Sequence, residues 1–128
     1  MEYVGKVNYD EELPQYNTEN GVATGNEVGV SESNPLMWID AVEKVFEKTA
    51  DSGFPMKYIK SISVSGQQHG LVALDSNGNL ARTMAKLWND FSTQEECDLL
   101  TEKMGGNDNM ILETSNTQRT GYTAAKIY

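Results

Sequence analysis

Ser63 to Gly70 reads Ser-Val-Ser-Gly-Gln-Gln-His-Gly and continues into the apolar run Leu71-Val72-Ala73-Leu74. The β-rich residues before the corner predict a strand from Tyr58 to Ser65, and the glycine that follows predicts a turn. That turn carries Gln68 beside His69, the only histidine of the chain. Carboxamide and imidazole groups both donate and accept hydrogen bonds, so the corner suits a polyhydroxylated ligand such as a sugar.

A second group of polar side chains is expected near this corner. Asn77-Gly78 is a tight-turn dipeptide, which predicts a hairpin whose return strand runs from Leu80 to Trp88. Trp88-Asn89-Asp90 ends that strand, and an aromatic ring beside polar groups is a common composition of carbohydrate sites. Two structural alternatives stay open: His69 bonded to main chain at a strand end, and Trp88 in the core beside an Asn-Asp turn.

Helices are expected on both sides of the hairpin. Asn34-Pro35 predicts a helix start, apolar residues continue at helical spacing, and Gly53 predicts the end. The apolar positions of this helix are Ile39, Val42, Val45, Phe46 and Ala50. Thr93 with Glu96 predicts a capping box for a helix that ends at Gly105-Gly106.

The remaining segments are less regular. Residues 3–9 alternate well enough to predict a strand, and residues 14–33 are expected to form loop or a short edge strand. Residues 107–119 are polar around Met110-Ile111-Leu112, and residues 120–128 predict the first turns of another helix. The chain is long enough for one domain with one core.

Composition excludes several classes of partner. The formal net charge of -9 disfavours nucleic acid and anionic membranes. No apolar stretch is long enough to span a bilayer, and Met1-Glu2-Tyr3 does not begin a signal peptide, so a cytoplasmic location is expected. Cys97 falls among apolar helix positions, which predicts a small buried hydrophobe rather than a metal ligand.

Catalytic patterns are missing. No nucleophile elbow accompanies Ser65, His69 and Asp90, and neither type of glycine-rich phosphate loop occurs. The acidic runs Asp10-Glu11-Glu12 and Glu95-Glu96 are typical of solvated faces. The sequence therefore predicts no catalytic residue and no metal site in this chain.

Several motifs together resemble the first domain of the xylulose kinase branch of the FGGY carbohydrate kinase family. In chain order they are Glu32-Ser33-Asn34-Pro35 with Trp38, Ser65-Gly66-Gln67-Gln68-His69-Gly70, Leu87-Trp88-Asn89-Asp90, and Thr120-Gly121-Tyr122-Thr123-Ala124-Ala125-Lys126. Their order and spacing both fit, and the similarity covers nearly all of residues 30–128. The resemblance implies a ribonuclease H-like, actin-like α/β domain with a mixed sheet and flanking helices.

The resemblance also implies a function. Family members use ATP and Mg²⁺, and xylulose kinases phosphorylate the C5 hydroxyl of D-xylulose to give D-xylulose 5-phosphate. Residues 1–128 would be the sugar-binding portion of the N-terminal domain. The family's first hairpin with its Asp-x-Gly-Thr loop, its catalytic base and its ATP-binding domain would be absent, so we expect the fragment alone to be inactive.

Carried over residue by residue, the resemblance makes Gln68 and His69 the substrate-binding pair. Trp88, Asn89 and Asp90 would border the substrate pocket. The family usually has arginine two positions after that aspartate, whereas this chain has Ser92, which leaves the local salt bridge and the sugar open. Gluconate or fuculose are alternative substrates.

Other functional classes remain as hypotheses. One is a stand-alone sugar-binding or regulatory module without catalysis, and another is a purely structural interaction domain. Reading the encoding gene on both sides of the chain would distinguish the kinase from the module. A sheet without its first hairpin would expose an edge, so self-association through that edge is expected.

Overall fold

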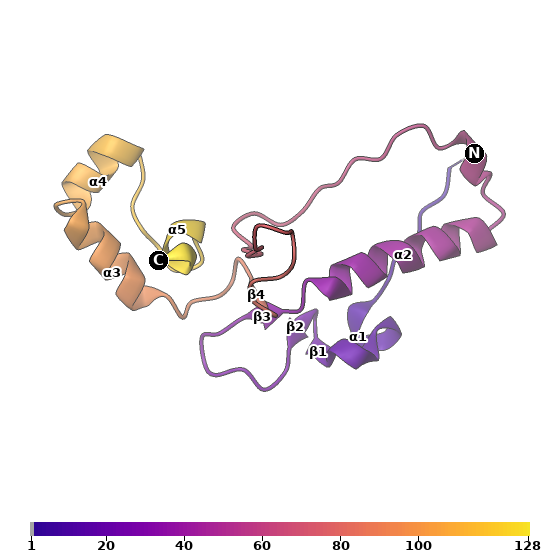
Figure 1. Ribbon diagram of the computed structural model, residues 1–128, viewed down its shortest axis with the longest axis horizontal. Helices are drawn as coiled ribbons and strands as arrows, with labels where there is room; N and C mark the ends of the chain where they lie inside the picture. Colours follow the sequence, from indigo (N-terminus) through magenta and orange to yellow (C-terminus); the bar gives the residue numbers. More distant parts are fainter. Residues whose placement is uncertain (1) are drawn as a thin grey trace. The chain divides into compact units, whose positions relative to one another are not determined.

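The computed structural model describes residues 2–128, which form two compact units (Figure 1). The first unit contains residues 2–24 and 33–66, and the second contains residues 25–32 and 67–128. The helices and strands, in chain order, are α1 (Tyr9–Glu12), η1 (Pro14–Tyr16), β1 (Thr18–Glu19), β2 (Val22–Ala23), β3 (Glu32–Ser33), α2 (Leu36–Asp51), η2 (Met56–Tyr58), β4 (Ala85–Lys86), α3 (Gln94–Lys103), α4 (Asn107–Thr114) and α5 (Thr123–Ile127).

Helix α2 begins and ends where the sequence predicts. The Oδ1 atom of Asn34 accepts a hydrogen bond from the N–H of Leu36 at 3.0 Å, which satisfies one free donor of the first turn. At the other end Gly53 has a φ of +79°, and its N–H donates to the carbonyl of Ala50 at 3.0 Å. Both predicted ends are confirmed.

The core of the first unit lies on the opposite face of α2 from the apolar stripe in the sequence. Met37 and Ala41 are buried there. Around them lie Leu13, Val7, Tyr9, Tyr16 and Trp38. Ile39, Val42 and Phe46 are instead 58%, 51% and 36% exposed. The apolar stripe predicted for this helix is therefore largely exposed among the described residues, because periodicity locates a stripe without saying which element covers it.

The strand predicted for residues 3–9 is not formed: residues 3–8 belong to no helix or strand, and α1 begins at Tyr9. The Oδ1 atom of Asn8 accepts a hydrogen bond from the N–H of Asp10 at 3.1 Å and so caps α1. Strands β1 and β2 then pair antiparallel through a turn at Asn20-Gly21, where both residues have positive φ. The side chain of Asp10 holds this turn by accepting hydrogen bonds from its N–H groups at 2.6 and 3.1 Å.

The predicted hairpin is present in the second unit, but only Ala85–Lys86 of its predicted return strand, Leu80 to Trp88, is a strand. Antiparallel bridges join Leu71 to Lys86 and Leu74 to Leu80. Its turn is built on Asp75, whose Oδ1 atom accepts hydrogen bonds from the N–H groups of Asn77 and Asn79 at 2.8 and 2.9 Å. Strand β4 lies in the second arm of the hairpin and pairs with β3.

The strand predicted from Tyr58 to Ser65 and the mixed sheet are not formed by residues 2–128. The structure has two separate two-stranded sheets, and residues 59–66 belong to no strand. A strand needs a neighbour for its N–H and C=O groups, and the described residues supply none to this run. Its side chains are correspondingly exposed, with Ile62 at 67% and Val64 at 87%.

Three helices complete the second unit, and α3 contacts both α4 and α5. Helix α3 ends as predicted, because the N–H groups of Gly105 and Gly106 bond back to its last carbonyls at 2.9 Å. Its predicted capping box does not form: Thr93 has φ −105° and ψ 36°, away from the extended conformation of a capping residue. Cys97 is buried as predicted, and burial raises the pKa of its thiol.

Candidate functional site

Gln68 and His69 lie in an exposed turn of the second unit. The backbone of His69 is left-handed, with a φ of +61°, a conformation that is uncommon outside glycine and recurs at functional sites. Among residues 2–128, neither side chain has a hydrogen-bond partner. The alternative in which His69 bonds to main chain through its ring is therefore not seen, and both polar groups face solvent.

The imidazole of His69 packs on the ring of Tyr122. The ring centroids are 4.7 Å apart and the planes differ by 26°. Tyr122 lies in the turn that leads into α5, so this stacking fixes the direction of the imidazole without using its nitrogen atoms. The arrangement leaves the ring's donor and acceptor free for a ligand.

Trp88 and Asn89 follow the hairpin's return strand. Trp88 is 58% exposed, so it is not a core tryptophan in this unit. The Oδ1 atom of Asn89 is buried and has no donor among the described residues. Buried acceptors are nearly always satisfied. A donor from a ligand or from another part of the protein would fit this oxygen.

Asp90 is placed differently from its two neighbours, because its side chain is fully buried. Its carboxylate accepts hydrogen bonds from the N–H of Ser31 at 2.9 Å and from the hydroxyl of Ser92 at 2.7 Å. Burial alone would raise the pKa of Asp90, but these bonds, the N–H of Ser92 and the charge of Lys86 outweigh it and lower the pKa. Asp90 therefore anchors its own segment and does not face solvent.

Lys86 provides the positive charge beside Asp90, where Ser92 provides none. Its Nζ atom is 2.7 Å from the Ser92 hydroxyl and 3.3 Å from Asp90 Oδ1. Glu32, which is 7% exposed, pairs with both Lys86 and Arg82. The sequence did not show which cation pairs with Asp90, because residue 92 is a serine. In the structure that cation is Lys86 from β4. We call Glu32, Arg82, Lys86 and Asp90 the charge cluster.

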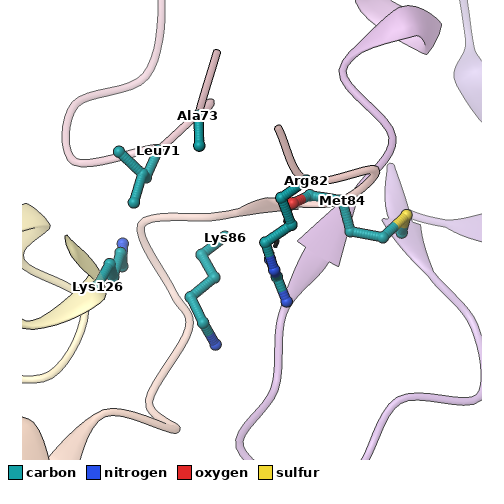
Figure 2. Close-up of a pocket in the computed structure, with 6 residues that line it drawn as sticks. All are labelled: Leu71, Ala73, Arg82, Met84, Lys86 and Lys126. Atoms are coloured by element: carbon teal, nitrogen blue, oxygen red, sulfur yellow. Dashed lines mark hydrogen bonds between the residues drawn. The ribbon is translucent and has the colours of Figure 1, made fainter. Parts of the chain in front are cut away.

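A shallow cavity lies beside the charge cluster (Figure 2). Its lining residues are Leu71, Ala73, Arg82, Met84, Lys86 and Lys126. Its volume of about 40 Å³ is room for only a few water molecules. A sugar would not fit inside it, so the exposed Gln68-His69 turn is the better candidate for ligand contact.

Comparison with known proteins identifies the family. Residues 7–128 match the model of the FGGY family of carbohydrate kinases, N-terminal domain. The chain belongs to the FGGY family of carbohydrate kinases. It is 39% identical to a xylulose kinase of Haemophilus influenzae over 104 residues, covering 77% of this chain. It is 40% identical to a xylulose kinase of Bacillus subtilis over 100 residues, again covering 77% of this chain.

The FGGY fold is supported by a solved structure as well. A crystal structure of a xyloylose kinase from Brucella ovis aligns with a TM-score of 0.69 and 30% identity over 83% of this chain. The α/β chain therefore resembles a sugar kinase domain. The chain spans about a fifth of each relative: 21% and 19% of the two xylulose kinases and 21% of the solved chain. Within residues 2–128, no helix is long and apolar enough to cross a membrane.

Sequence reasoning overlooked the residues that support the corner. Lys126 and Tyr122 belonged to a family motif but were given no role, although Lys126 donates a hydrogen bond to the carbonyl of His69 at 2.6 Å. Arg82 and Lys86 were read only as part of a strand. The burial of Glu32, which requires a cation nearby, is seen only in the structure, so the sequence held no signal for this pairing.

Proposed function

We propose that this chain is the sugar-binding portion of an ATP-dependent carbohydrate kinase that converts D-xylulose to D-xylulose 5-phosphate. The observation that carries the proposal is the exposed Gln68-His69 turn, whose polar groups are free among residues 2–128 while its backbone is held. Trp88 and Asn89 would border the sugar, with Asp90 supporting them from inside. The xylulose kinases named above support D-xylulose over gluconate or fuculose.

The proposal extends to the parent protein. We assign residues 1–128 to a ribonuclease H-like, actin-like N-terminal domain whose first hairpin and ATP-binding partner domain lie outside this sequence. The chain alone would then be inactive. Its free buried Cys97 fits a reducing compartment, and we propose a cytoplasmic location.

ATP and Mg²⁺ are implied by the family, and the residues present do not fit either group. Within residues 2–128, no cluster of three histidine, cysteine or acidic side chains is arranged to hold a metal ion. The sequence also has no glycine-rich phosphate loop. We therefore assign this chain to the acceptor side of phosphoryl transfer, and the nucleotide would be held elsewhere in the parent enzyme.

Replacing His69 with alanine tests the proposed substrate contact. In the full-length protein that carries this chain, the variant should lose about 1–3 kcal/mol of sugar binding, because a polar site is left unpaired. Steady-state kinetics with D-xylulose should show a raised KM. The matched control is Gln67→Ala, which removes a neighbouring exposed carboxamide and should leave KM within about twofold.

Three results would count against parts of this proposal. Unchanged KM and kcat in His69→Ala would remove the residue from the pocket. A wild-type protein that phosphorylates gluconate or fuculose better than D-xylulose would change the substrate while leaving the sugar site in place. Phosphorylation of D-xylulose by the 128-residue chain alone would contradict the assignment of catalysis to other parts of the protein.

We also propose that the chain self-associates through residues 59–65. This run has no strand partner among the described residues, and Ile62 and Val64 are exposed. Sedimentation velocity should show a species whose size grows with concentration. Val64→Lys should weaken this association, whereas Leu112→Lys, at another exposed apolar position on α4, should not. A monomer that does not respond to dilution would refute the proposal.

A further inference from the structure

The ammonium group of Lys126 lies among three backbone carbonyls. Its Nζ atom donates to His69 O at 2.6 Å, to Leu87 O at 2.7 Å and to Gly121 O at 2.6 Å. An ammonium group has three N–H donors, so these bonds use all of them. Lys126 has no carboxylate within ion-pair distance among the described residues, so its hydrogen-bond partners are peptide carbonyls, while the negative charge of Asp90 acts on it from a greater distance.

The three carbonyls belong to three separate segments of the second unit. His69 is in the Gln68-His69 turn, Leu87 immediately precedes Trp88, and Gly121 is in the turn before α5. Lys126 projects from α5 toward the side chain of Leu71, and both residues line the cavity (Figure 2). One side chain therefore ties together the two segments that carry the candidate sugar contacts.

The contacts of His69 also show that residues 122–126 hold it in place. Its ring stacks on Tyr122, and its carbonyl accepts from Lys126, so both ends of the residue are held by residues 122–126. The backbone of His69 is in the left-handed region, which persists only where the surroundings hold it. Burial lowers the pKa of Lys126, as expected for an ammonium group withdrawn from water.

We propose that Lys126 is a positioning residue, whose ammonium group fixes His69 and the Trp88 segment in the arrangement that the sugar requires. This inference rests on the proposed function, because Lys126 can position the turn for the sugar only if the sugar binds there. A ligand that meets a turn already in place loses less entropy on binding, so removing the support should weaken sugar binding. Lys126 would not touch the sugar, since all its donors are occupied.

The test replaces Lys126 with methionine, which keeps the length of the side chain and removes its donors. In the full-length protein, KM for D-xylulose should rise about ten- to hundredfold, the scale for misplaced binding groups, while KM for ATP stays within about twofold. Lys126→Arg should recover part of the loss, because guanidinium also donates several hydrogen bonds. The matched control is Lys44→Met, which removes a lysine bond to the carbonyl of Glu12 in the other unit and should leave both constants unchanged.

A second measurement does not depend on the sugar. His69 is the only histidine, so its imidazole protons give a single set of NMR signals in the 128-residue chain. In the wild type these signals should be shifted upfield by the ring of Tyr122. That shift should be lost in Lys126→Met and kept in Lys44→Met. This measurement reports on the position of the turn, which a loss of overall stability would not move while the protein stays folded.

The outcomes separate the two proposals. A wild-type protein that binds no ketosugar refutes the proposed function, while a lost His69 shift in Lys126→Met still supports the positioning of the turn. Unchanged KM and an unchanged His69 shift in Lys126→Met overturn the inference. If Lys126→Met does not fold, Lys126→Gln decides, because its amide keeps only two of the three N–H donors on a shorter side chain. A raised sugar KM at an unchanged melting temperature supports positioning, and wild-type KM overturns it.

Discussion

Replacing Asp90 with alanine is expected to lower the free energy of unfolding of the second unit by about 3–5 kcal/mol, the cost of breaking a buried ion pair. The Asp90 side chain is fully buried and accepts hydrogen bonds from Ser31 and Ser92. Its removal leaves these donors unpaired. It also leaves Lys86, whose side chain is 20% exposed, without one of its two carboxylates.

Urea denaturation followed by tryptophan fluorescence measures this loss. The chain has two tryptophans, and Trp38 lies in the first unit while Trp88 lies in the second. A Trp38→Phe background therefore reports on the second unit. Asp98→Ala is the matched control, because its exposed carboxylate bonds only the amide of Gln94, and it should cost less than about 0.5 kcal/mol. A loss below about 1 kcal/mol in Asp90→Ala would contradict the role of Asp90 as an anchor.

The same residue gives a pH dependence of known sign. The pKa of Asp90 in the folded chain lies below its ordinary value of 3.8. The unfolded chain therefore binds a proton more readily, and ionised Asp90 adds stability above pH 3.8 that is lost as pH falls through the lower folded pKa. Asp90→Asn should lack this part of the acid sensitivity in denaturation curves recorded below pH 4.

Features that depend on a few neighbouring residues were predictable from the sequence. Asn34 and Gly53 bound α2 because a cap needs only the N–H and C=O groups of the adjacent turn. The Asp75 turn and the end of α3 follow from equally local contacts. The predicted positions of the hairpin and of most helices were therefore confirmed.

Features that depend on distant partners were not predictable. Residues 58–65 have strand-forming side chains, but a strand forms only against another strand. The exposed face of α2 at Ile39 and Val42 shows the same limit, because its pattern was correct and its covering element could not be known. Sequence patterns thus predicted local elements better than their pairing.

The candidate site divides in the same way. Gln68 and His69 were predicted from adjacent residues at a turn, and the structure does place them in one. The support for that turn joins residues 57 and 39 positions apart, from Lys126 to His69 and to Leu87. No spacing rule relates such positions. The ion-pair partner of Asp90 could not be predicted, because Ser92 carries no charge. Lys86 takes that role, and it lies close to Asp90 only when β4 and the following segment have folded.

Replacing Gly121 with valine should destabilise the second unit through two separate effects. Gly121 has a φ of +86°, where a side chain costs about 1–3 kcal/mol of backbone strain. A Cβ atom there would also lie 2.5 Å from the carbonyl oxygen of Trp88, and such overpacking costs a further amount of about 1–3 kcal/mol. The turn and the Trp88 segment would have to separate, which would also pull the Gly121 carbonyl away from Lys126.

Gly78→Val separates strain from contact. Gly78 lies in the same unit with a φ of +83°, but a Cβ atom there meets nothing within 4 Å. Urea denaturation should therefore show a smaller loss for Gly78→Val, and the difference between the two variants measures the contact with Trp88. Equal losses would mean that the turn before α5 does not lie against the Trp88 carbonyl. Because Lys126 bonds the carbonyls of Leu87 and Gly121 across this same contact, that result would also remove the geometric basis for its support of the corner.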